Sequence, residues 1–296
     1  MRKIMKKALG FTLAALMTLS LAACSSAGGG ATGESAAGQD GTAAQESTVA
    51  GTQTEQSVTA ESAVSGEKIV NVGVTDTLTS LNPLLLNGGE VNKYATGLMF
   101  LPLMELDADL NFVPMVADSI TTEDNLNFVV HIDEAATWSD GTPITADDVA
   151  YTALRLASPM VNNTSMMYYV FEGVGDDGFV EEGAESIEGV QVIDEKTVQF
   201  TTKEPMALMT FLNSYARYLL TLPKHVIETF AEDELTTQAW FNQPDVISGP
   251  FYLTDFDVDH YVSYTANENY WKGAPKIDKL NIRIVDGSQL YAGLQS

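Results

Sequence analysis

The feature that most constrains this chain is a stretch of 43 residues that cannot pack into a core. Residues 25–67 contain no aromatic residue, no Leu or Ile and no Lys or Arg. Such a segment buries too little apolar surface to offset the conformational entropy that it would lose on folding. We therefore predict a disordered tether over residues 24–67 and a folded body that begins at Lys68.

The segment before the tether has the anatomy of an export signal. Residues 1–7 are the basic stretch MRKIMKK, and residues 8–23 are apolar or small. A spanning helix needs about 20 apolar residues, so this run is short for one. The segment ends in Leu21-Ala22-Ala23-Cys24, which resembles the lipobox of bacterial lipoproteins. An N-terminal anchor helix and an ordinary secretory signal with a chance cysteine are the alternatives.

The lipobox resemblance implies a signal peptide over residues 1–23, cleavage before Cys24, and acylation of Cys24 by chains such as palmitate. Two acyl chains give a stable membrane anchor where one is marginal. Because Cys24 is the only cysteine, no intramolecular disulfide and no multi-thiolate metal site can form.

The charge balance excludes several classes of partner. The chain has 15 basic and 40 acidic residues, a formal net charge of −25. Such a field opposes binding to nucleic acid and to anionic lipid head groups. Between Tyr94 and Glu195 the one Lys or Arg is Arg155, against 20 acidic residues. This acidity indicates either a cavity for cationic or amino-terminal ligands or a solubilising surface.

The hydrophobic pattern predicts a mixture of strands and helices. Leu126, Phe128, Val130 and Ile132 alternate with polar or outward positions, which predicts a half-buried strand with His131 on its outer face. Thr145 followed by Asp148 resembles a capping box that opens a helix. Further strands are expected over residues 69–74, 190–193, 197–200, 251–253, 261–264 and 280–285, and helices over 91–104, 205–213 and 224–231.

Motifs for common enzyme chemistry are absent from the sequence. There is no phosphate-binding loop, no His-Glu-x-x-His and no Gly-x-Ser-x-Gly. The three histidines, His131, His225 and His260, are far apart and show no metal-ligand spacing. We therefore expect a protein that is not an enzyme and that needs no cofactor and no metal, with an anchored secreted hydrolase as the alternative from another class.

Five short motifs carry a family resemblance. They are Ser80-Leu81-Asn82-Pro83, the run WSDGTPITADDV over residues 138–149, Leu222-Pro223-Lys224-His225, Ser248-Gly249-Pro250-Phe251 and the run NENYWKG over residues 267–273. Together they resemble family 5 of the extracytoplasmic solute-binding proteins of ABC importers, which includes dipeptide, oligopeptide and nickel binders. Asn82 and Phe251 stand where the family usually has Asp and Tyr.

The resemblance implies an α/β fold of the periplasmic-binding-protein type II, with two lobes around a cleft. Because members of the family are considerably longer, we expect here only lobe I, truncated before lobe II. Residues 68–103 would form its first part, residues 104–204 an inserted subdomain and residues 205–296 its continuation.

The resemblance also implies a function. The expected protein is a monomeric lipoprotein that captures peptides on the outer face of the cytoplasmic membrane, or in the periplasm of a two-membrane envelope. It would deliver them to the permease and ATPase of an ABC importer. A nickel or other metal-chelate binder is the alternative within the family, and a purely structural surface lipoprotein is a third class.

The expected ligand contacts are carried over from the family pattern. They lie in the loop Asn82–Gly89, in an aromatic pair, in a Ser-Gly backbone and in the pair Tyr270-Trp271, which we expect in the core rather than in the pocket. The candidate residues are Asn82, Asn87, Gly88, Tyr168, Tyr169, Ser248, Gly249 and Tyr270. Ordinary packing is an equally good explanation for Tyr168 and Tyr169.

Overall fold

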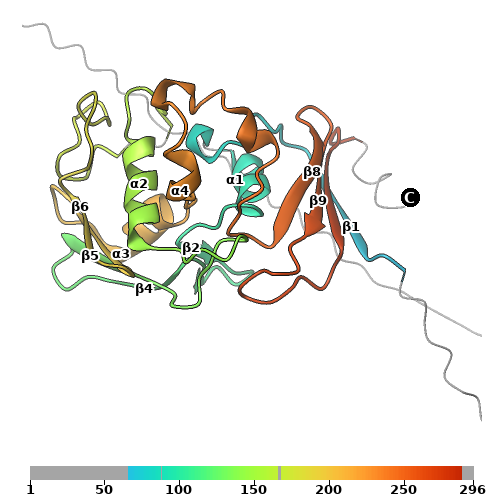
Figure 1. Cartoon of the computed structure of the whole chain (residues 1–296), viewed down its shortest axis with the longest axis horizontal. Coiled ribbons are helices and arrows are strands. Elements are labelled where there is room, and N and C mark those ends of the chain that lie inside the picture. The colour runs from blue at the N-terminus through green and yellow to red at the C-terminus, as the bar shows by residue number, and fades with distance from the viewer. Residues whose placement is uncertain (1–65, 88, 166–167, 289–296) are drawn as a thin grey trace, which may run out of the picture. The chain divides into compact units, whose positions relative to one another are not determined.

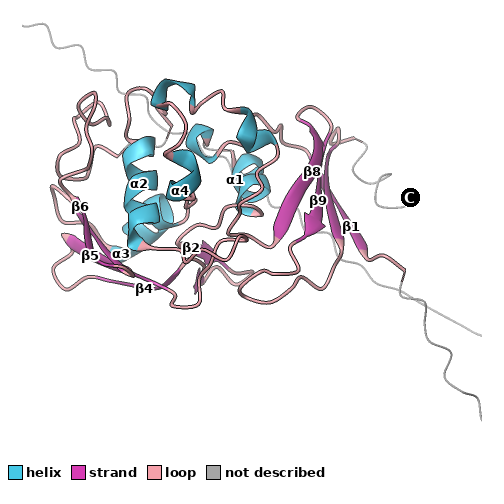
Figure 2. Cartoon of the chain, viewed as in Figure 1, coloured by secondary structure: helices cyan, strands magenta, loops and turns pink. Residues whose placement is uncertain are grey.

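Two four-stranded sheets flank the helices in the computed structural model of the chain (Figure 1). The structure describes residues 66–87, 89–165 and 168–288. The expectations for the signal peptide, the tether and Gly88 therefore lie outside the described residues. Figure 2 shows strands on two sides of the view and helices between them.

The first sheet joins the start of the folded body to its last strands. Its order is β1 (Ile69–Val74), β10 (Lys279–Ile284), β9 (Tyr261–Ala266) and β8 (Phe251–Asp257). β1 pairs in parallel with β10, and the other pairs are antiparallel. These strands confirm the sequence prediction.

The second sheet has the order β4 (Ala117–Thr121), β5 (Asn127–Ile132), β7 (Thr197–Thr201) and β6 (Val190–Asp194), all antiparallel. Phe128, Val130 and Ile132 are fully buried, as the alternation predicts. The His131 side chain is 37% exposed on the other face. A two-stranded ribbon of β2 (Met104–Leu106) and β3 (Phe112–Pro114) precedes this sheet.

The helices are short, apart from α2. They are η1 (Pro83–Leu85), α1 (Glu90–Gly97), α2 (Ala146–Leu156), α3 (Leu208–Phe211), the π-helical turn η2 (Leu212–Ala216), α4 (Lys224–Ile227), η3 (Glu232–Glu234) and η4 (Ala239–Asn242). α2 packs on β6 and β7, and the hydroxyl of Tyr264 in β9 donates to the carbonyl of Ala95 in α1. Both sheets are thus joined to the helices.

The run over residues 138–149 has a structural role in this fold. The buried carboxylate of Asp148 accepts hydrogen bonds from the backbone N–H of Thr145 (2.9 Å), the backbone N–H of Lys224 (2.8 Å) and the indole N–H of Trp138 (3.4 Å). Trp138 itself is 1% exposed. The predicted cap of α2 is confirmed, and this motif contributes to stability rather than to an open site.

The expected helix over residues 91–104 is wrong at its C-terminal end. α1 ends at Gly97, because carbonyl groups of the segment that follows bond to distant parts of the chain and not to a further helical turn. The carbonyl of Met99 accepts from the N–H groups of Ser248 and Gly249, and the carbonyl of Leu101 accepts from Thr221. The other two helices also differ from expectation, since α3 begins at Leu208 and continues into η2, and α4 ends at Ile227.

Candidate ligand-binding face

The side chain of Asn82, at the start of the loop Asn82–Gly89, is hydrogen-bonded within the fold. Its side chain is 5% exposed; its Oδ1 accepts from the N–H of Leu84 at 2.9 Å and so caps η1. Its Nδ2 donates to the carbonyl of Leu235 at 2.9 Å. Asn82 therefore fixes where the loop begins.

The other end of the loop is tied to α1 by amide side chains. The Oδ1 of Asn87 accepts from the N–H of Gly89 (3.0 Å) and from the Nδ2 of Asn92 (3.1 Å). The Oδ1 of the buried Asn92 accepts in turn from the N–H of Thr79 at 2.7 Å. The middle of the loop is held by Asn163, whose Nδ2 donates to the carbonyls of Leu84 (2.9 Å) and Leu86 (3.0 Å).

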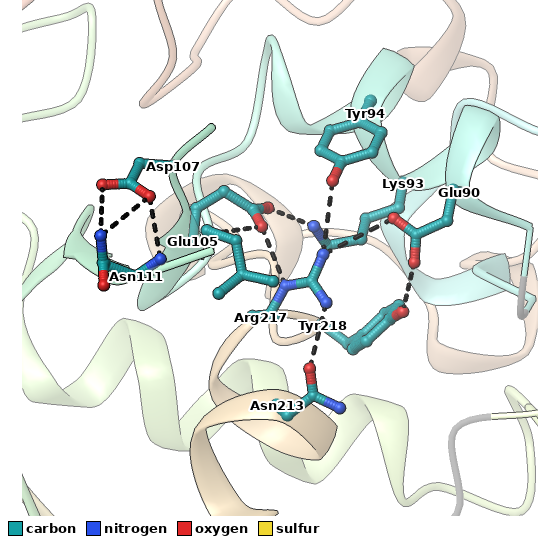
Figure 3. Close-up of polar contacts among 10 residues, drawn as sticks. Glu90, Lys93, Tyr94, Glu105, Asp107, Asn111, Asn213, Arg217 and Tyr218 are labelled. Atoms are coloured by element: carbon teal, nitrogen blue, oxygen red, sulfur yellow. Dashed lines mark hydrogen bonds and ion pairs between the residues drawn. The ribbon is translucent and has the colours of Figure 1, made fainter. Parts of the chain in front are cut away.

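Charged and polar side chains from α1, β2 and the region of η2 meet in one group, and we call this group the charged cluster (Figure 3). Lys93 is 1% exposed and its ammonium forms an ion pair with Glu105 of β2. Arg217, which follows η2, donates to Glu105 at 2.9 Å and lies 3.6 Å from the carboxylate of Glu90. The members of the cluster are Glu90, Lys93, Tyr94, Glu105, Asn213, Arg217 and Tyr218.

The electrostatics of the charged cluster are nearly balanced. Burial alone would raise the pKa of Glu105, but the bonds from Lys93, Leu106 and Arg217 outweigh it and hold that pKa below its usual range. Burial and the bond to Glu90 raise the pKa of Tyr218 to about 12. Two cations thus face two carboxylates, and the carboxylate of Glu90 is the more open one, with its side chain 48% exposed.

The aromatic pair divides between core and surface. Tyr168 is fully buried, and its ring packs on Phe171 and Tyr215 with centroids 5.5 and 5.8 Å apart. No hydrogen-bond partner for its hydroxyl lies within the described ranges, and burial raises its pKa well above the usual value. Tyr169 is 49% exposed and lines an open groove with Pro205, Met206 and Ala207 at the start of α3.

Ser248 and Gly249 have their backbone groups occupied within the fold. Both N–H groups donate to the carbonyl of Met99, and the carbonyls accept from Trp271 (3.3 Å) and Asn267 (3.1 Å). A Cβ on Gly249 would lie 2.2 Å from the carbonyl oxygen of Leu98. The close approach that this glycine permits is therefore to the chain's own backbone.

Tyr270 is partly buried beside Trp271, with ring centroids 6.1 Å apart, and desolvation raises its pKa to about 12. Ser248 and Gly249 contact the segment after α1, whereas Asn87 and the charged cluster contact α1 itself. The structure thus brings the loop Asn82–Gly89, α1 and η2 together, and we call their surface the α1–η2 face. Ser248, Gly249 and Tyr270 lie apart from the contacts that build it.

Sequence reasoning missed the charged cluster. Glu105 and Arg217 are 112 positions apart, so no local spacing reveals their contact. The available signal was Arg217 itself, a single charged residue within the apolar and aromatic run Tyr215–Leu222. A charge in such a run is buried with a partner more often than it is left alone.

Within residues 66–87, 89–165 and 168–288, no group of three or more His, Cys, Asp or Glu side chains is arranged to hold a metal ion. In the same ranges, none of the helices combines the length and the apolar character that crossing a membrane requires.

Known proteins match this chain over most of its folded body. The family model of the bacterial extracellular solute-binding proteins, family 5 (middle region), matches residues 111–296. A Brucella ovis protein named for ABC transporter peptide binding is 32% identical over 222 residues, 73% of this chain and 38% of the relative. The periplasmic oligopeptide-binding protein OppA of Escherichia coli is 27% identical over 201 residues, 67% of this chain and 36% of that protein.

The fold agrees with these matches. The crystal structure of the ABC transporter substrate binding protein CtaP from Listeria monocytogenes superposes with a TM-score of 0.59 at 29% identity. The superposition covers 77% of this chain and 42% of CtaP. The chain therefore spans less than half the length of the relatives that it matches.

Proposed function

Because the chain belongs to family 5 of the bacterial extracellular solute-binding proteins, we propose that the protein captures peptides outside the cell for an ABC importer. The observation that carries the proposal is the match over 222 residues to a relative named for peptide binding. The oligopeptide-binding name of the second relative supports the same ligand class. In this proposal the protein hands its cargo to a permease that an ATPase drives, and no bond in the peptide is broken.

The α1–η2 face is one wall of the proposed binding cleft. It presents the open carboxylate of Glu90 and the ring of Tyr94, which is 49% exposed. An extended peptide offers an ammonium group to such a carboxylate and aromatic or apolar side chains to such a ring. Closure by a hinge motion would then shift the population toward the loaded form.

The candidate ligand residues divide into two groups within this proposal. Asn87 and Tyr169 are partly or largely exposed, and we assign direct contact to them. Asn82 and Tyr168 are buried, so they support the wall from behind, whereas the buried Ser248 and Gly249 hold the segment after α1. Gly88 and Tyr270 stay candidates.

We propose that Cys24 is acylated and holds the folded body at the outer face of the cytoplasmic membrane through the tether. The lipobox-like run Leu21–Cys24 supports this anchor. In cells fed labelled palmitate, the wild-type chain should carry label and Cys24→Ser should carry none. A labelled Cys24→Ser chain, or an unlabelled wild-type chain, would contradict the anchor.

Native mass spectrometry of the full chain tests the ligand class. The chain is mixed with an equimolar pool of synthetic tri-, tetra- and pentapeptides of random sequence, and in a second sample with a nickel–histidine chelate. We expect stoichiometric peptide adducts and an unchanged pool after prolonged incubation. Adducts of the chelate alone would replace the peptide proposal with metal-chelate binding, shortened peptides would show hydrolysis, and no adduct with either probe would overturn ligand capture by this chain.

A further inference from the structure

We propose that Arg217 is a positioning residue that holds α1, and through it the loop Asn82–Gly89, in the arrangement needed for ligand binding. The inference rests on the proposed function, because it concerns the same face. The inference goes beyond the proposed function because it names a residue that acts through its neighbours.

Arg217 joins three elements with one side chain. It is 6% exposed and directs its guanidinium into the charged cluster (Figure 3). Its Nε donates to Glu105 of β2 at 2.9 Å, and its Nη1 donates to Asn213 of η2 at 3.2 Å. Its Nη2 donates to the Tyr94 hydroxyl at 3.4 Å and lies 3.6 Å from Glu90, both in α1. A planar fork with five donors can serve these directions at once, whereas an ammonium cannot.

The π-helical turn explains why Arg217 reaches this position. The N–H of Arg217 donates to the carbonyl of Leu212 at 3.1 Å, five residues earlier. Without the extra residue of the π-helical turn, the Arg217 side chain would point in a different direction around the helix axis. The wider turn therefore directs Arg217 toward α1, and such turns are frequent at functional sites.

α1 depends on outside contacts for its position. It has eight residues, and Gly89 at its N-cap supplies no side-chain cap. A helix this short is marginal by itself, so tertiary contacts decide where it lies. The contacts of Arg217 reach its first residue, Glu90, and its fifth, Tyr94.

A shift of α1 would be transmitted directly to the loop. The N–H of Lys93 donates to the carbonyl of Gly89 at 3.3 Å, and Asn92 bonds to the Asn87 side chain at 3.1 Å. The Asn92 side chain also accepts from the N–H of Thr79, and it thereby holds the segment that leads into the loop. Arg217 on one side of α1 and Asn92 on another thus determine together where the loop lies.

Loss of Arg217 should loosen this arrangement without unfolding the protein. Glu105 would keep its ion pair with Lys93, so no carboxylate in the buried part of the cluster would be left without a cation. Glu90 would lose its cation but is half exposed and can be hydrated. We therefore expect the effect to concentrate on α1 and the loop.

Arg155 provides a matched control. It is also a poorly exposed arginine, with its side chain 12% exposed, and it pairs with Glu232 at 2.8 Å. It lies in α2, and its contacts with Glu232 and with the ring of Tyr151 involve no residue of α1. Arg155→Gln therefore removes a similar ion pair without touching α1.

The test compares Arg217→Gln, Arg217→Lys and Arg155→Gln in the full chain. Binding is measured by calorimetry with the tightest peptide retained from the random tri- to pentapeptide pool, and backbone amide exchange is measured over residues 89–97. We expect Arg217→Gln to weaken binding at least 10-fold and to speed exchange in α1 at least 10-fold, with Arg217→Lys closer to wild type in both. We expect Arg155→Gln to change neither by more than 2-fold, although it lowers the melting temperature.

Two outcomes would decide against one proposal and leave the other standing. Unchanged affinity and unchanged exchange in Arg217→Gln would overturn the positioning role, while binding by the wild-type chain would still support the proposed function. Failure of the wild-type chain to bind any peptide would overturn the proposed function, and the exchange measurement would still decide whether Arg217 positions α1.

A second variant keeps the inference testable where Arg217→Gln does not fold. Tyr218→Phe removes the hydroxyl that donates to Glu90 at 2.7 Å and leaves the ring in place. Because it loosens the same end of α1 more gently, we expect exchange over residues 89–97 to rise about 3-fold. Exchange equal to wild type in this variant would contradict the role of the charged cluster in holding α1.

Discussion

At the scale of single residues, Gly249 shows how a family motif can be required by packing. A Cβ at this position would meet the carbonyl of Leu98 at 2.2 Å and the backbone of Met99 at 2.9 Å. Backbone cannot move aside as the end of a flexible side chain can, so Gly249→Ala should destabilise the fold by about 1–3 kcal/mol. Chemical denaturation with urea measures this change.

Gly97 is the matched control for that prediction. It is the last residue of α1, and a Cβ there would meet nothing within 4 Å. Gly97→Ala should therefore be neutral or should stabilise by up to about 1 kcal/mol. Equal stability changes in the two alanine variants would show that the close approach at Gly249 does not constrain the fold.

Asp124 gives a pH dependence whose sign can be worked out. Its carboxylate accepts from the N–H groups of Leu126 (2.9 Å) and Asn127 (2.8 Å) and from the Asn127 amide (2.7 Å), which lowers its pKa to about 2. A carboxyl whose pKa is lower in the folded state stabilises that state above its unfolded pKa of about 3.9. The stabilisation is then lost as the pH falls toward 2.

Asp124→Asn separates the charge from the geometry of this turn, because an amide oxygen can still accept these bonds. We expect wild type to melt higher than Asp124→Asn at pH 7 and the difference to vanish near pH 2. A carboxyl carbon titration by NMR gives the midpoint directly. A midpoint near the unperturbed value would contradict the bonding described.

At the scale of elements, the N-terminus of α2 is stabilised by one buried carboxylate. Asp148 bonds to Thr145, Lys224 and Trp138, and burial raises its pKa despite these bonds. Asp148→Ala removes the acceptor of four donors, since the Thr145 hydroxyl also bonds to this carboxylate, so we expect a loss of about 2–4 kcal/mol. Asp147→Ala, at a 63% exposed neighbour that pairs with Lys224 at 3.4 Å, should cost less than about 1 kcal/mol.

Denaturation of both variants measures the difference between these adjacent positions. Similar losses in the two variants would mean that the negative charge in the first turn, rather than the buried network of Asp148, stabilises α2. A loss confined to Asp148→Ala would show that the family run over residues 138–149 is retained for packing.

Comparison of α2 with α1 shows which features could be predicted from the sequence. β1, the strands from β5 to β10 and the start of α2 follow from alternation and capping, which are properties of a few neighbouring residues, whereas β2, β3 and β4 were not predicted. The end of α1 and the π-helical turn could not be predicted, because they depend on bonds to segments such as Ser248 and Thr221 that lie far away in sequence. For the same reason the candidate list contained Asn87 and Tyr169 but not Arg217.

At the scale of the whole molecule, the described residues share one apolar core. Buried side chains of the second sheet, such as Phe128 and Val130, belong to the same hydrophobic cluster as Val262 and Tyr264 of the first. Phe100 and Leu101, which follow α1, are buried in this cluster too. The boundaries predicted for an inserted subdomain at residues 104 and 204 therefore do not coincide with a break in the core.

A shared core has a consequence for unfolding. Elements that bury one another's apolar surface lose stability together, whereas separate cores unfold in separate steps. We expect a single calorimetric transition whose van't Hoff and calorimetric enthalpies agree. Trp138, beside α2, and Trp271, beside Ser248, provide fluorescence probes at two places in the fold. Within each single Trp→Phe variant, the fluorescence transition should coincide with the calorimetric one, whatever the change in midpoint. Two separated transitions would show instead that residues 104–204 form an independently stable subdomain.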